Sequence, residues 1–164
     1  MSSANIVICR TCSRIRTWFT FHESGIAMNE TSTNPRVRAA VEAYGSDDTN
    51  CSQAIVMAYC DEVGIDPEMA RGLVWGLGGG IGGMGLMCGA LTAATCVVSA
   101  RCAQEGYDKS GTYEKVREAC ELFEDRMGTM DCADILNGEV PRPLCCQRAV
   151  QVAAECIEEV CGGL

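Results

Sequence analysis

The chain has 164 residues, of which 48% are hydrophobic, and its formal net charge at pH 7 is −9. A chain of this length can bury one compact core without disulfides, so we expect a single domain. The acidity argues against nucleic acid or anionic lipid as a partner. An uninterrupted apolar run of roughly 18 residues would be needed to span a membrane, and the sequence contains none.

Thirteen cysteines are an unusually large number for a chain of this size. In a secreted protein they would indicate a disulfide framework. Their number is odd, however, and no signal peptide precedes them. We therefore expect reduced thiols and a cytoplasmic protein.

The first 27 residues differ from the rest of the chain in charge and in pattern. They carry three arginines against one glutamate and show no sustained helical period. We interpret residues 1–27 as a disordered tail or a mis-assigned start, and residues 28–164 as a single cysteine-rich helical redox domain. Cys9 and Cys12 have the spacing of a metal or redox pair, but no second pair matches them.

His22, the only histidine, also lies in residues 1–27. The domain therefore lacks the imidazole on which Cys–His catalysis and histidine zinc sites depend. A general acid or base would have to be a carboxylate with a shifted pKa or a cysteine, so whether the protein is an enzyme stays open.

From Pro35 onward the apolar residues recur with the period of helices, and no alternating segment indicates a strand. One helix is expected to begin at Cys51, with Asn50 as its N-cap and Gln53 as the N3 partner, and to end at Gly64. Later helices are expected over residues 66–77, 91–106, 113–127, 131–136 and 143–160. The sequence therefore predicts an all-α bundle of about five to six helices, with a glycine-rich loop before the central helix.

That loop, residues 76–85, contains seven glycines in ten residues. Glycine lets backbone N–H groups approach a bound group closely, and Gly89 leaves space beside the sulfur of Cys88. We interpret the loop as one wall of a cofactor pocket, with tight helix packing at a glycine-rich elbow as the alternative. The glycines also satisfy a nominal dinucleotide fingerprint, but they follow a helical segment rather than a strand.

The cysteines of the predicted helices form two sets. Those of the first set lie in a first helical turn, where free N–H groups and the macrodipole favour thiolate over thiol: Cys51, Cys88, Cys132, Cys145 and Cys146. Those of the second set lie in helix bodies or ends and are expected to act as small buried hydrophobic residues: Cys60, Cys96, Cys102, Cys120, Cys156 and Cys161.

Four segments of the chain resemble a redox-active protein family with dispersed cysteines around a CGAxxG motif, the C_GCAxxG_C_C family, over about residues 35–161. "NCSQA" resembles the first cysteine box, "GLGGGIGGMGLMCGALTA" the glycine-rich approach and central motif, "DCADIL" the third box and "CCQRAVQVAAECI" the fourth. In the fourth box, the spacing to Val150 and Ala153 selects Cys146 over Cys145. Ala93 replaces the last glycine of the motif.

The family is similar to a domain of split-Soret cytochromes, which hold an iron–sulfur cluster besides their haems. This resemblance implies a [2Fe–2S] or [4Fe–4S] cluster bound by Cys51, Cys88, Cys132 and Cys146, with Gly89 beside it. It also implies electron transfer with a redox partner protein, or redox sensing. The haem part is not implied, because the chain has no CxxCH motif.

Other functions remain open from the sequence. The cysteine spacings of 37, 44 and 14 residues are unlike those of ferredoxins. A metal-free thiol–disulfide protein could use two cysteines of low pKa, and a structural zinc protein could use all four as ligands. Cu(I) is a further alternative, because Met84 and Met87 lie near Cys88. Whether the chain forms a homodimer is also open.

Overall fold

The computed structural model describes residues 32–46, 48–138 and 140–162. The predicted tail, with the Cys9–Cys12 pair and His22, lies outside these residues. The described residues form one 3-10 turn, η1 (Trp75–Leu77), and seven α-helices: α1 (Pro35–Tyr44), α2 (Cys51–Tyr59), α3 (Pro67–Val74), α4 (Gly89–Gln104), α5 (Lys109–Met127), α6 (Cys132–Leu136) and α7 (Arg142–Cys161). Within them the only β-type pairing is an isolated bridge, so the all-α class is confirmed.

Local sequence signals explain where several helices begin and end. The Asn50 side chain accepts the N–H groups of Ser52 and Gln53, and Gln53 accepts the N–H of Asn50, which confirms the predicted capping box of α2. Asn34 caps α1 in a similar way, and α1 is a helix for which we predicted no separate span. Gly128 ends α5 in the left-handed conformation, as glycine at this position commonly does.

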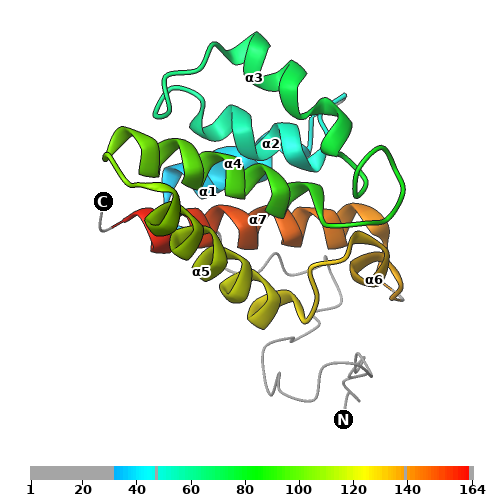
Figure 1. Ribbon diagram of the computed structural model, residues 1–164. Helices are drawn as coiled ribbons and strands as arrows, with labels where there is room; N and C mark the ends of the chain where they lie inside the picture. The colour runs from blue at the N-terminus through cyan, green and yellow to red at the C-terminus, as the bar shows by residue number, and fades with distance from the viewer. Residues whose placement is uncertain (1–31, 47, 139, 163–164) are drawn as a thin grey trace.

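Helix α7 runs through the middle of the bundle and packs against α1, α2, α4 and α5 (Figure 1). Large side chains buried in the core include Tyr59 of α2, Leu91 of α4, Phe123 of α5 and Ile157 of α7. Helix α3 packs against α2 on the outside of the bundle. None of the helices in the described ranges is both long and apolar enough to cross a membrane.

Helices α2, α4 and α7 run from one end of the bundle to the other. Their last turns meet around Arg101 of α4, which pairs with Glu62, just after α2, and donates to the carbonyl of Cys161 in α7. Their first turns lie at the opposite end, beside the glycine-rich loop and α6 (Figure 1). We call the first region the arginine end and the second the thiol end.

The glycine-rich loop follows a left-handed path that its own backbone hydrogen bonds fix. Gly79, Gly80, Gly82, Gly83 and Gly85 all have positive φ, which glycine adopts without the strain that a side chain would bring. Among the bonds that hold the loop, the N–H groups of Gly85 and Leu86 donate to the carbonyls of Gly79 and Gly80. The loop is therefore an ordered structure and not a flexible connection.

Residues 85–88, after the loop, run beside residues 130–133. The N–H of Cys88 donates to Met130 O over 2.8 Å, and the N–H of Cys132 donates to Leu86 O over 2.7 Å. Met87 and Asp131 form the isolated bridge between the two segments. This pairing places the start of α4 next to the start of α6, although Cys88 and Cys132 are 44 residues apart in sequence.

Candidate functional site

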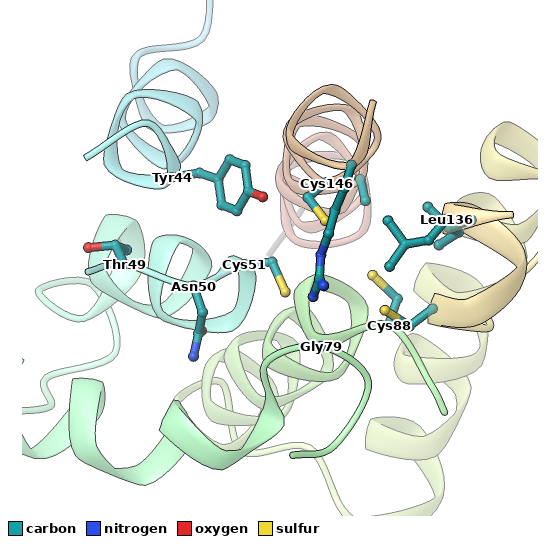
Figure 2. A pocket seen from close by; sticks show the side chains of 12 residues that line it. Tyr44, Thr49, Asn50, Cys51, Gly79, Cys88, Leu136 and Cys146 are labelled. Atoms are coloured by element: carbon teal, nitrogen blue, oxygen red, sulfur yellow. The ribbon is translucent and has the colours of Figure 1, made fainter. Parts of the chain in front are cut away.

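A cavity of about 150 Å³ lies at the thiol end, and four cysteines line it: Cys51, Cys88, Cys132 and Cys146. They come from the starts of α2, α4 and α6 and from the second turn of α7 (Figure 2). Such a volume holds several water-sized atoms. The four residues that the resemblance implies as ligands are thus brought together by the fold, and their role as ligands stays a prediction.

The positions of these cysteines relative to their helix starts differ in part from the prediction. Cys51 and Cys132 are the first residues of α2 and α6, and Cys88 is the N-cap of α4. Cys146 is the fifth residue of α7, because this helix begins at Arg142. The prediction of a first-turn position was therefore wrong for Cys146, which lies one turn inside the helix.

Cys51 lies in a pocket of backbone formed by the glycine-rich segment and α4. A Cβ atom added to Gly89 would lie 2.9 Å from the Cys51 sulfur and 2.6 Å from Leu77 O, both closer than real contacts allow. Gly89 therefore makes room for the sulfur of Cys51, whereas the sequence suggested Cys88. Gly89 itself is not one of the residues that line the cavity.

Burial raises the pKa of three of these thiols. That of Cys88 rises to about 12, and those of Cys51 and Cys132 also rise above the ordinary value. Backbone N–H groups near Cys51 and Cys88 act in the opposite direction but do not outweigh burial. The expected preference for thiolate is therefore wrong for these three cysteines without a bound metal, because the loss of water is the larger effect.

Arg142 and Tyr44 are among the lining residues that the sequence reasoning missed. Arg142 begins α7, and its Nη2 atom lies 3.6 Å from the place where a Cβ of Gly79 would stand. Tyr44 ends α1, and its ring points toward Cys146 (Figure 2). Burial raises the pKa of Tyr44, as does its contact with Cys146, while the charge of Arg142 acts in the opposite direction. The segment Pro141-Arg142-Pro143 before the cysteine pair could have indicated Arg142, but no comparable signal marks Tyr44.

The other cysteines of the described residues lie away from the cavity. Cys145 is directed elsewhere, since its thiol donates to Val140 O over 3.4 Å. Most of the set expected to be buried is buried, and Cys120 is half-buried. The expectation was wrong for Cys96, which is exposed because it faces away from the buried side of α4, two residues after Ala94. The described cysteines form no disulfide with one another.

The four thiols surround the cavity without converging on one point. In the part of the chain that the structure describes, no three Cys, His, Asp or Glu side chains are arranged to hold a single metal ion. Met84 and Met87, considered for Cu(I), are 72% and 41% exposed and do not line the cavity. A group that contacts all four sulfurs at once would have to fill the space between them.

A family model described as "Putative redox-active protein (C_GCAxxG_C_C)" matches residues 49–160, a span that contains all four cavity cysteines. The chain belongs to this family. The matched span of the C_GCAxxG_C_C family covers the four segments in which the sequence resemblance assigns Cys88 to the central motif and Cys51, Cys132 and Cys146 to the dispersed cysteines. Comparisons with curated proteins and with solved structures give no match.

Proposed function

We propose that this protein binds an iron–sulfur cluster in the cavity at the thiol end and uses it for electron transfer or redox sensing. The ligands are Cys51, Cys88, Cys132 and Cys146. One observation carries the proposal: four cysteines spread over 96 residues of sequence line a single cavity. Thiolates are the common ligands of such clusters, and four is the common number. The description of the family as redox-active agrees with this proposal.

The chemistry of the cavity supports a cluster as its occupant. Its soft metal donors are the four thiols, and neither histidine nor a carboxylate is among the lining residues of the described part. Soft thiolates select Cu(I), zinc or iron–sulfur clusters. A structural zinc needs its four sulfurs at about 2.3 Å from one centre. The thiols here stand around a space of about 150 Å³, which favours a group of several atoms.

The bound cluster would supply one-electron redox chemistry, and the chain would bind it and control its surroundings. The four thiols hold it at the junction of helices that come from distant parts of the sequence. Ile135, Leu136 and Ala149 supply apolar walls that limit the access of water. Backbone N–H groups at the starts of α2 and α4 act on Cys51 and Cys88, and their partial positive charge stabilises the negative charge of thiolate ligands.

The metal-free thiol–disulfide alternative receives less support. Its nucleophile must be a thiolate, whereas burial raises the pKa of Cys51, Cys88 and Cys132. We further propose a reducing compartment such as the cytoplasm, where unpaired cysteines persist, and a separate protein as the electron donor or acceptor.

Metal and sulfide analysis of protein purified without oxygen tests the proposal. We expect brown protein that contains iron and acid-labile sulfide in equal amounts, with a visible absorbance that bleaches on reduction. One zinc per chain without iron would overturn the cluster in favour of a structural zinc site. Colourless, metal-free protein with a reversible disulfide among the four cysteines would support the thiol–disulfide alternative instead.

A further inference from the structure

We propose that Arg142 sets the charge of this site, acting as a fixed positive charge that raises the reduction potential of the bound cluster. The effect on reduction potential rests on the proposed function, because it requires a bound cluster. The positive charge beside the thiols belongs to the chain alone and can be tested without metal.

Two prolines restrict the backbone around Arg142. This arginine is the first residue of α7 and lies between Pro141 and Pro143. Its side chain reaches the cavity, and its Nη2 atom lies against Gly79 of the glycine-rich loop, 3.6 Å from the place where a Cβ would stand. Cys146 is four residues further along α7, so the two side chains share one face of the helix.

The charge of Arg142 is not neutralised by a carboxylate of the described residues. Arg36, Arg101 and Arg126 each pair with at least one aspartate or glutamate, whereas Arg142 forms no ion pair within the described ranges. It is also the one charged side chain among the lining residues that the structure describes. A positive charge beside four thiols is therefore available to act on whatever they bind.

The physical consequence follows from the sign of the charges. A cluster held by four thiolates is more negative after it accepts an electron than before. A nearby positive charge stabilises the reduced form more than the oxidised form and so raises the reduction potential. The apolar walls of the cavity strengthen this effect, because they lower the local dielectric constant.

The first experiment measures the local charge in metal-free, reduced protein. Peptide mass spectrometry follows alkylation of Cys146, which is partly exposed, by anionic iodoacetate and by neutral iodoacetamide. The rate with iodoacetate divided by the rate with iodoacetamide reports the charge near the thiol. Changes in accessibility or in the thiolate fraction affect both rates and largely cancel in this ratio. We expect Arg142→Gln to lower this ratio about threefold at low ionic strength, and Arg142→Lys to preserve most of it.

Arg148→Gln is the matched control, because Arg148 lies on the same helix but does not line the cavity. The Arg148 variant should keep the ratio of the unaltered protein, and added salt should remove the difference caused by Arg142→Gln. An unchanged ratio in Arg142→Gln, or an equal fall in Arg148→Gln, would overturn the local-charge inference.

The second experiment is a potentiometric titration of the cluster-loaded protein, followed by visible absorbance. Arg142→Gln should lower the midpoint potential at unchanged iron content, while Arg142→Lys and Arg148→Gln stay near the original value. An unaltered protein that binds no cluster would defeat the proposed function but leave the alkylation result valid. If the midpoint potential of the cluster-loaded protein is the same with and without Arg142, only the inference about reduction potential is wrong.

Discussion

The two ends of the helical bundle satisfy their helix termini in different ways. At the arginine end, Arg36 pairs with Asp61 and Glu62 and also donates to the carbonyl of Ala58. Arg101 donates to the carbonyl of Cys161. These guanidinium groups meet the partial negative charge at the last turns of α2 and α7. At the thiol end, the first turns of α2 and α4 direct their positive ends toward a cavity lined by thiols.

This difference separates the scaffold of the molecule from its reactive part. Polar groups at the arginine end find partners within the chain: Tyr59 donates to Glu158, and Glu158 also accepts from Asn34. At the thiol end, four soft donor groups and one arginine surround a space that no side chain fills. A ligand is therefore expected at the thiol end, and changes at the arginine end should affect stability without affecting that ligand.

The largest effect should come from the adjacent cysteines of α7. Cys146→Ser removes a thiol that lines the cavity, so we expect loss of most of the iron and sulfide, because the cluster is left with an open position and unbalanced charge. Cys145→Ser changes a thiol that bonds to Val140 O, and it should keep both. Anaerobic iron, sulfide and absorbance measurements on the two variants show which of the two cysteines is a ligand.

The same measurement extends to the remaining cysteines. Serine at Cys51, Cys88 or Cys132 should behave like Cys146→Ser, whereas alanine at Cys60 or Cys102 should spare the centre, at a cost of about 1–2 kcal/mol for a lost buried contact. A centre lost from Cys145→Ser and kept in Cys146→Ser would show that the wrong member of the pair was assigned.

A second effect should distinguish two glycines of the loop. A Cβ on Gly80 would lie 2.7 Å from the Cβ of Cys132 and 2.7 Å from the backbone of Leu86, whereas a Cβ on Gly82 would meet nothing within 4 Å. Both glycines have positive φ, so both alanine variants carry a backbone strain of about 1 kcal/mol. Gly80→Ala should in addition displace Cys132 and reduce iron content.

Thermal unfolding and iron analysis of the two glycine variants test this difference. Equal iron content in Gly80→Ala and Gly82→Ala would show that the loop tolerates movement at Cys132. It would contradict the view that the close approach of Gly80 to Cys132 shapes the site.

Much of the fold was predictable because its signals are local. The capping box at Asn50 and the left-handed glycine after α5 each act within one turn of helix, and the structure has both where the sequence indicates them. The choice between the adjacent cysteines of the last helix needed a longer pattern. The resemblance selects Cys146 over Cys145 by its spacing to Val150 and Ala153, and in the structure Cys146 is the one that lines the cavity.

Features that depend on several distant segments were not predictable from the sequence. The pKa of Cys88 depends on how many other segments remove water from it, so a local argument from the helix start predicted the wrong direction. Gly89 was assigned to the sulfur of Cys88, its neighbour, although the close approach is to Cys51, 38 residues earlier in the chain. Tyr44 reaches the site only because α1 ends beside the start of α7.

A smaller effect is expected at the arginine end from Tyr59→Phe. The Tyr59 hydroxyl is buried and donates to Glu158 over 2.8 Å, so its removal should lower the free energy of unfolding by about 1–2 kcal/mol and leave iron content unchanged. Loss of iron from this variant would show that the two ends are coupled. Tyr113→Phe, at an exposed tyrosine of α5, is the control and should change neither quantity.

The difference between Tyr59→Phe and the unaltered protein should also depend on pH. Burial, followed by the bond to Glu158, raises the pKa of Tyr59 above its ordinary value of 10.0. Below pH 10 the phenol is protonated in both the folded and the unfolded chain. Above pH 10 it ionises only in the unfolded chain, which lowers the stability of the unaltered protein. Urea unfolding at pH 8 and pH 10.5 should therefore show the difference shrinking as pH rises, and a constant difference would contradict the raised pKa.

The smallest effect should come from Ala93→Gly, which restores the last glycine of the family motif. Ala93 is fully buried in the second turn of α4 but does not line the cavity, so we expect iron content to stay the same. The free energy of unfolding should fall by about 1–2 kcal/mol, from the lower helix propensity of glycine and the loss of a buried methyl group. Ala94→Gly, at the neighbouring buried position, carries the same two costs and is the matched control. Higher iron content in Ala93→Gly than in Ala94→Gly would show that the methyl group of Ala93 crowds the thiol end. Equal iron content in the two variants would show that alanine in place of the motif glycine affects only the packing of α4.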